Sequence, residues 1–197
     1  MTRLGLLGGT FDPPHFGHVL AAQEVAWQLH LECVLFLPAR QNPLKRGAPS
    51  SEAEHRCEMV ARAIGDNPLF SLSRLDIDRP PPSYTADLLQ HLQAVDRELF
   101  FVVGADILPE LPRWRSPEEV LRLARLAVVN RPGSPVPNLD DLEAALPGAR
   151  GRTDLVRIPG VDVSAAEIRA RVRSGQPIRY LTPPAVEDYI RDKGLYV

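Results

Sequence analysis

The sequence predicts an α/β fold in which a parallel sheet is covered by helices on both faces. Short β-rich runs alternate with segments of helical periodicity, and the runs are continuously apolar, as expected of strands that are buried on both sides. The 197 residues, 44% of them hydrophobic, suffice for one full core. We therefore expect a doubly wound, Rossmann-like parallel sheet in a single domain spanning residues 1–197.

The expected elements follow one another along the whole chain. Strands are predicted at residues 3–9, 33–39, 69–77, 98–104, 126–132 and 154–160. Helices are predicted at 17–30, 51–64, 84–94 and 117–125, and a C-terminal helical part at about 163–197.

Helix boundaries carry capping signals. A serine followed three residues later by glutamate is typical of a capping box, and this pattern predicts helix starts at Ser51, Ser116 and Ser164. Gly175 and Gly194 are predicted to end helices.

Charge and composition narrow the class of partner. The 23 Lys and Arg residues are balanced by 25 Asp and Glu, so no basic field indicates nucleic acid or an anionic membrane as the partner. The sequence has no apolar run of membrane-spanning length and no signal-peptide core, and Cys33 and Cys57 lack any pairing pattern. We therefore expect a cytoplasmic protein with small-molecule substrates, and the sequence leaves a homo-oligomer open.

A glycine turn follows the first strand. Gly8 and Gly9 come between the strand and an amphipathic helix, and glycine allows positive φ and close approach of a ligand to the backbone. The start of the next helix offers unpaired N–H groups, so the sequence predicts an anion site there. The pattern is neither the dinucleotide GxGxxG nor a P-loop.

Two histidines stand at the start of that helix. His15 and His18 are three residues apart and so share one face, where their rings could hydrogen-bond phosphate oxygens. Gly17 between them permits close packing or substrate approach. A capping histidine and half of a metal site are the alternative interpretations, although no HExxH or Cys/His cluster completes a metal site.

The string "GGTFDPPHFGH" at residues 8–18 resembles the HxGH signature of the nucleotidyltransferase superfamily. Further segments, among them "FFVVGADILPELPRW", "VDVSAAEIRARVRSG" and "YLTPPAVEDYIRDKGLY", are similar to bacterial nicotinate-nucleotide adenylyltransferases, and the similarity runs from about residue 3 to 196. The resemblance implies that a substrate phosphate attacks the α-phosphate of ATP and that pyrophosphate leaves. It also implies nicotinate mononucleotide as acceptor, and Mg²⁺ held mainly by the ATP phosphates rather than by a protein metal site.

The resemblance also implies roles for individual residues. It assigns charge stabilisation at the phosphates to four residues, namely His15, His18, Lys45 and Arg169. It assigns ATP binding to Gly8, Gly9, Thr10, Phe11, Gly17, Gly104, Asp106, Ser164 and Ile168. It assigns the nicotinate nucleotide to Ser83, Tyr84, Thr85 and Trp114.

Several of these roles also suit the local sequence. Ser83 to Thr85 precede a helix whose free N–H groups suit a carboxylate, although helix capping alone would also explain them. Trp114 lies in a loop between two arginines, a poor setting for a buried ring and a good one for stacking on a pyridine ring. Asp106 follows a strand, where it could accept bonds from ribose hydroxyls or cap the next helix.

Two positions depart from the family pattern. Ala166 replaces a common threonine and Leu44 replaces a common histidine, while Lys45 beside it is kept. Two other hypotheses therefore stay open: an adenylyltransferase for another acceptor, such as nicotinamide mononucleotide or phosphopantetheine, and a non-catalytic nucleotide-binding regulator.

Overall fold

A parallel sheet forms the centre of the structure, a computed structural model that describes residues 2–40, 50–80, 84–130 and 137–197. Within these residues the sheet has six strands, in the order β3-β2-β1-β4-β5-β6, all parallel. This order confirms the Rossmann-like, doubly wound sheet. The strands are β1 (Thr2–Gly9), β2 (Cys33–Pro38), β3 (Phe70–Leu72), β4 (Arg97–Gly104), β5 (Ala124–Asn130) and β6 (Thr153–Arg157).

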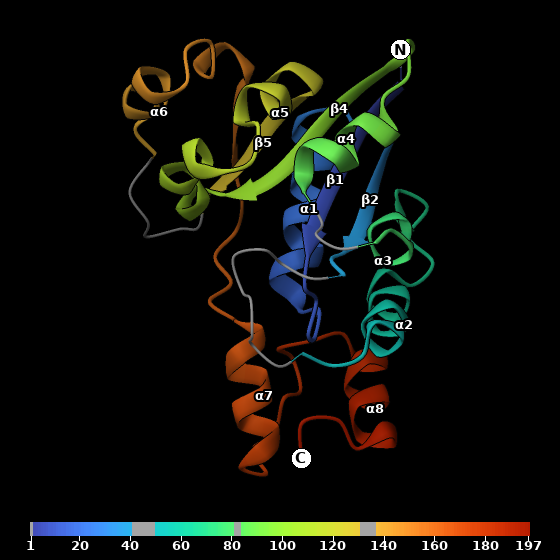
Figure 1. The fold of residues 1–197 in the computed structure, drawn as a ribbon. Helices are drawn as coiled ribbons and strands as arrows, with labels where there is room; N and C mark the ends of the chain where they lie inside the picture. Colours follow the sequence, from blue (N-terminus) through green and yellow to red (C-terminus); the bar gives the residue numbers. More distant parts are fainter. Residues whose placement is uncertain (1, 41–49, 81–83, 131–136) are drawn as a thin grey trace.

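Helices cover both faces of this sheet, as expected. On one face lie α1 (Phe16–Gln28) and α2 (Ala53–Ile64). On the other face lie α4 (Thr85–Leu92), the 3-10 helix η2 (Ala105–Arg113), α5 (Pro117–Leu123) and α6 (Leu139–Ala145). Figure 1 shows α4 and α5 on the side of the strands opposite α1.

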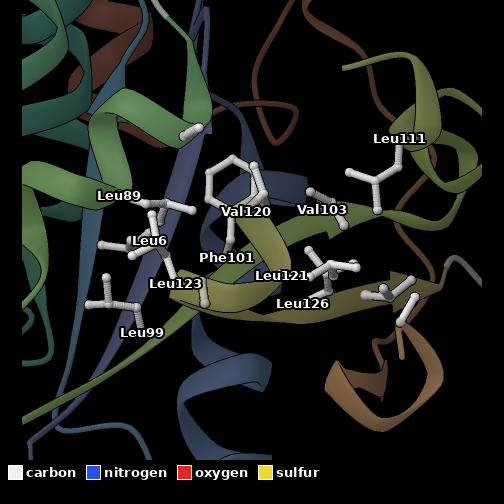
Figure 2. Packing of buried hydrophobic residues seen from close by; sticks show 14 of the residues in the cluster. Leu6, Leu89, Leu99, Phe101, Val103, Leu111, Val120, Leu121, Leu123 and Leu126 are labelled. Carbon is white, nitrogen blue, oxygen red and sulfur yellow. The ribbon is translucent and has the colours of Figure 1, made fainter. Parts of the chain in front are cut away.

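Successive side chains of each central strand divide between two cores. Leu6 and Phe101 are register partners that pack under α4 and α5, where Figure 2 shows them with the leucines of both helices. Their neighbours Leu7 and Phe100 belong to the core under α1. Because β1 and β4 are buried on both faces, they read as continuous apolar runs in the sequence.

The C-terminal part forms a third cluster. Helices α7 (Ala165–Arg173) and α8 (Pro184–Lys193) pack with α2 around buried Met59, Ile168 and Ile190. They lie beyond the carboxyl ends of β1 and β2 (Figure 1). This places a second layer of chain next to the edge of the sheet at which Rossmann-like folds bind ligands.

Some local expectations were wrong. The run 69–77 is not one strand, because β3 ends at Leu72 and α3 (Leu75–Asp78) follows. Ser51 lies before the N-cap of α2, which is Glu52. Ser116 is the N-cap of α5, so the predicted helix start there is confirmed, but its side chain makes no cap bond. At α5 the backbone carbonyl of Ser116 accepts from the N–H of Glu119 at 3.1 Å instead. The sequence patterns did not predict the helices α3 and α6 or the 3-10 helix η2.

Other local expectations are confirmed. The Ser164 hydroxyl caps α7 by accepting from the N–H of Glu167 at 3.1 Å. Gly194 ends α8 with φ 58°, and Gly175 follows α7 with φ 70°. Both glycines adopt the left-handed conformation that a Cβ atom disfavours.

Membrane spans were searched for in the part of the chain that the structure describes. No helix there combines the length and the apolar character needed to cross a bilayer.

Truncating the sheet core tests the packing directly. Leu126 on β5 is 0% exposed, and we expect Leu126→Ala to lower the free energy of unfolding by about 2–5 kcal/mol because it leaves a cavity between packed layers. Leu155 on the edge strand β6 is 45% exposed, so Leu155→Ala should cost no more than about 1 kcal/mol. Urea denaturation measures both values, and equal losses would contradict the core assignment.

Candidate active site

A cavity of about 480 Å³ opens at the carboxyl ends of β1 and β4. These two strands are neighbours at the centre of the sheet, and the chain leaves them toward opposite edges, so their ends diverge and leave a crevice. The cavity brings together most of the residues that the sequence singled out: Gly8, Gly9, His15, Gly17, His18, Tyr84, Thr85, Gly104, Asp106 and Trp114.

The two histidines lie side by side at the start of α1. His15 is the N-cap residue and His18 lies in the first turn, and their ring centroids are 3.8 Å apart. The backbone N–H of His15 donates to Nδ1 of His18 at 3.2 Å. Because Nδ1 accepts this bond, a neutral His18 ring carries its proton on Nε2 and presents a hydrogen-bond donor there.

Gly17 is required by the packing of His15. A Cβ atom at Gly17 would lie 3.0 Å from Nδ1 and 3.1 Å from Cε1 of the His15 ring. A glycine between the histidines therefore lets the His15 ring fold back against the first turn of α1. This agrees with the expectation of close packing at Gly17.

The turn between β1 and α1 differs from the expectation in one respect. Gly8 and Gly9 belong to β1, and the positive φ of the turn falls on Phe11 (52°) instead. Gly9 serves another purpose, since a Cβ atom there would lie 3.1–3.3 Å from the Phe11 ring. Phe11 is 2% exposed and its ring lies edge-on to His18, with centroids 5.0 Å apart.

Thr10 and Phe11 lie behind the cavity rather than in its lining. The Thr10 hydroxyl is buried and has no hydrogen-bond partner among the described residues. Their expected contact with ATP therefore stays a prediction.

The far side of the cavity is formed by the start of α4 and by the end of η2 with the two residues that follow it. Tyr84 is the N-cap of α4, and Thr85 is its first residue. The guanidinium of Arg115 lies 4.4 Å from the centroid of the Tyr84 ring. Trp114 follows η2 and stands edge-on to Phe101, with centroids 6.1 Å apart. Its ring is thus held by the core on one side and faces the cavity on the other.

Asp106 lies above the end of β4. A Cβ atom at Gly104 would collide with Oδ1 of Asp106, so the glycine leaves room for this carboxylate at the strand end. Both residues line the cavity, and their contact with ATP stays a prediction.

Three expected residues of the C-terminal part do not line the cavity. Ser164 caps α7, and Ile168 is fully buried in the third cluster. Arg169 reaches the turn from behind, where its Nη1 donates to the carbonyl oxygen of Asp12 at 2.6 Å. Only the segment before α7 reaches the cavity, through Val161 and Val163. Lys45, Leu44 and Ser83 lie outside the described residues.

Sequence reasoning missed Asp76, Arg113 and Arg115, which also line the cavity. Asp76 is 5% exposed, and its Oδ2 accepts from the backbone N–H of Arg40 at 3.1 Å. Assigning 69–77 to one strand concealed it, whereas recognising a strand end at Leu72 would have placed Asp76 at the ligand-binding edge. Within the described residues, no group of three or more His, Cys, Asp or Glu side chains is arranged to hold a metal ion.

Comparisons with known proteins agree on one family. The cytidylyltransferase-like family model matches residues 6–171. A protein of Roseiflexus sp. (strain RS-1) called "Probable nicotinate-nucleotide adenylyltransferase" is 47% identical over 195 residues, covering 98% of this chain and 97% of its own. A protein of Thermomicrobium roseum with the same name is 45% identical over 198 residues, covering 100% and 92%.

Solved structures share the fold. Nicotinic acid mononucleotide adenylyltransferase of Plasmodium falciparum, solved in complex with NaAD, superposes with a TM-score of 0.80 at 18% identity and covers 100% of this chain and 98% of its own. The same enzyme in complex with APC gives a TM-score of 0.78, with equal identity and coverage.

The fit between Gly17 and His15 can be tested by one added methyl group. We expect Gly17→Ala to displace the His15 ring, so that the His15–His18 centroid distance departs from 3.8 Å in a crystal structure of the variant. The free energy of unfolding should change by no more than about 1 kcal/mol, because the helix preference for alanine over glycine opposes the cost of moving the His15 ring.

Gly151→Ala is the matched control, because a Cβ atom at Gly151 would meet nothing within 4 Å. A histidine pair that stays in place in Gly17→Ala would contradict the packing role of Gly17.

Proposed function

Because the chain belongs to the cytidylyltransferase-like family, as a nicotinate-nucleotide adenylyltransferase, we propose that it transfers the adenylyl group of ATP to nicotinate mononucleotide. The products are nicotinate adenine dinucleotide and pyrophosphate. One observation carries the proposal: a single cavity has a phosphate-type site at the start of α1 and an aromatic wall at Trp114. It is supported by 47% identity to a relative over nearly the full chain.

The reaction we propose is a direct in-line displacement. A phosphate oxygen of nicotinate mononucleotide attacks the α-phosphorus of ATP, a new P–O bond forms, and the bond to the β-phosphate oxygen breaks. No protein nucleophile takes part. Catalysis then consists of positioning two anions and stabilising the charge of the transition state.

His18 and His15 are proposed to act on the phosphates. The Nε2–H of His18 donates to a phosphate oxygen, and the N–H of Gly17 in the first turn of α1 adds a further donor. Arg169, which holds the turn at Asp12, lends positive charge from behind. Lys45 is assigned the same electrostatic role by the family resemblance alone.

The acceptor is proposed to bind at the other side of the cavity. Trp114 stacks on the pyridine ring, and the N–H groups at the start of α4, at Tyr84 and Thr85, receive the nicotinate carboxylate. Gly104 and Asp106 lie at the carboxyl end of β4 and line the same cavity, and they are proposed to contact the ATP ribose.

Mg²⁺ is proposed to enter with the ATP phosphates. Asp76 and Asp106 line the cavity with carboxylate oxygens, the ligands that Mg²⁺ prefers, so the donors present suit the ion. When bound, it would neutralise part of the triphosphate charge.

We further propose a cytoplasmic location, in keeping with two free cysteines. A homo-oligomer stays an open expectation.

Release of pyrophosphate tests the function. Purified protein with ATP and Mg²⁺ is given nicotinate mononucleotide, nicotinamide mononucleotide or phosphopantetheine in separate reactions. We expect release mainly with the nicotinate compound. Comparable rates with nicotinamide mononucleotide would indicate a dual-specificity enzyme, and ATP binding without release under any acceptor would support the regulator instead.

His18→Ala should reduce kcat by about 100- to 1,000-fold, because one donor to the transition-state charge is lost. The thermal midpoint should fall only modestly, since the ring's contacts with Phe11 and His15 and its bond from the N–H of His15 are lost, and a helix cap contributes about 1 kcal/mol. His91→Ala, at an exposed position in α4, is the control and should keep normal kcat. Near-normal turnover in His18→Ala would remove His18 from the mechanism.

Trp114→Ala should raise KM for nicotinate mononucleotide about 3- to 10-fold, because a stacked ring pair contributes about 0.5–1.5 kcal/mol. KM for ATP should stay the same. Trp27→Ala is the control, since Trp27 on α1 is 77% exposed and lies outside the cavity lining. An unchanged KM for the acceptor in Trp114→Ala would place the pyridine ring elsewhere.

A further inference from the structure

A buried polar network behind the turn between β1 and α1 takes no part in the mechanism above. Its members are Asp12, which is 3% exposed, Arg56, which is 2% exposed, and the half-buried Tyr196. Charged side chains are rarely so deeply buried, and they stay so only when their hydrogen bonds are made. We therefore expect this network to hold part of the backbone in a fixed conformation.

Asp12 is held at three atoms. Its Oδ1 accepts from the hydroxyl of Tyr196 at 2.6 Å, its Oδ2 accepts from the N–H of Ser51 at 3.1 Å, and its carbonyl oxygen accepts from Arg169 at 2.6 Å. Bonds to a carboxylate are about twice as strong as neutral ones. Asp12, in the middle of the turn, is thus bonded to α7, to the segment before α2 and to Tyr196.

Arg56 donates hydrogen bonds to three backbone carbonyl oxygens around the turn. Its Nη1 donates to the carbonyl oxygens of Thr10 (2.9 Å) and Ala39 (2.7 Å), and its Nε donates to that of Ser51 (3.1 Å). Burial lowers the pKa of Arg56, while the charge of Asp12 acts in the opposite direction. The guanidinium joins the turn to the end of β2 and to the segment before α2.

The turn needs such support because Phe11 is strained. Its φ of 52° lies in the left-handed region, which is rare for a bulky residue and costs about 1–3 kcal/mol. Such a conformation persists only where the surroundings hold it. Phe11 is in edge contact with His18, so the conformation of the turn and the place of the catalytic ring are linked.

Tyr196 lies 184 residues from Asp12 in the sequence and connects the C-terminal part to this turn. Thr182 adds a bond to the carbonyl oxygen of Pro14 at 2.7 Å, and the N–H of Phe16 donates to Leu181 at 3.2 Å. Burial and the bond to Asp12 raise the pKa of Tyr196 above its usual range, so its hydroxyl remains a donor.

We propose that the Tyr196 hydroxyl is a positioning group for adenylyl transfer: by holding the carboxylate of Asp12, it fixes the strained turn that places His15 and His18 at the phosphates. This rests on the proposed function. Tyr196 does not line the cavity and touches no substrate, so it acts through Asp12. Because misplacement of a reacting group by about 1 Å can cost 100-fold in rate, a loosened turn reduces kcat. Acceptor binding at Trp114 is unaffected, since Trp114 lies on other elements.

Tyr196→Phe tests this by removing one oxygen while keeping the ring against Met59 and the third cluster. Tyr189→Phe is a matched control, because Tyr189 packs in the same cluster and its hydroxyl lies 2.9 Å from Nδ1 of His55, away from the turn. For both variants, kcat, KM for each substrate, the thermal midpoint and the ring NMR resonances of His18 are measured.

In Tyr196→Phe alone, we expect kcat to fall about tenfold or more, KM for nicotinate mononucleotide to stay within about twofold, and the His18 resonances to shift. Equal kcat in the two variants, or unmoved His18 resonances, would overturn the proposal and leave Tyr196 a purely structural residue. If the wild-type protein transfers nothing to nicotinate mononucleotide, the proposed function fails, and the His18 resonances alone decide the positioning role.

Asp12→Asn is the second variant. It keeps the size of the side chain and removes the charge that strengthens the bonds from Tyr196 and Ser51. We expect a loss of kcat in the same direction as in Tyr196→Phe, and a wild-type kcat would overturn the proposal.

Discussion

The carboxylate of Asp12 is the point on which the site depends, because one buried side chain holds a strained turn in place. Phe11 can adopt its left-handed backbone only while groups from α7, from the segment before α2 and from Tyr196 fix its neighbour. This turn also sets the position of the start of α1, and therefore the position of His15, the N-cap residue of that helix. The placement of His15 and His18 therefore depends on residues that do not line the cavity.

The sheet supplies the frame in which this turn can act. Its two central strands, β1 and β4, end side by side, and the chain leaves them in opposite directions. The crevice between their ends receives the start of α1, at Gly17 and His18, and the start of α4, at Tyr84 and Thr85. The start of α1 forms the histidine side of this cavity and the start of α4 forms the Trp114 side. A molecule carrying phosphate at one end and a carboxylated ring at the other matches that arrangement.

Local pattern predicted the parts of this site that are local in the sequence. The apolar runs of β1 and β4, the start of α1 and the spacing of His15 and His18 are all visible over a few residues. The partnership of Tyr196 with Asp12 spans 184 residues and leaves no such pattern. Likewise the turn took its positive φ at Phe11 rather than at a glycine, because tertiary hydrogen bonds overrode the local preference.

A crystal structure of the protein with a non-hydrolysable ATP analogue and Mg²⁺ tests the central claim most directly. We expect phosphate oxygens about 3 Å from Nε2 of His18 and from backbone nitrogens at the start of α1, with Asp12 still bonded to Tyr196. Phosphates bound away from the two histidines, or a turn that abandons the Asp12 contacts to bind them, would contradict this account.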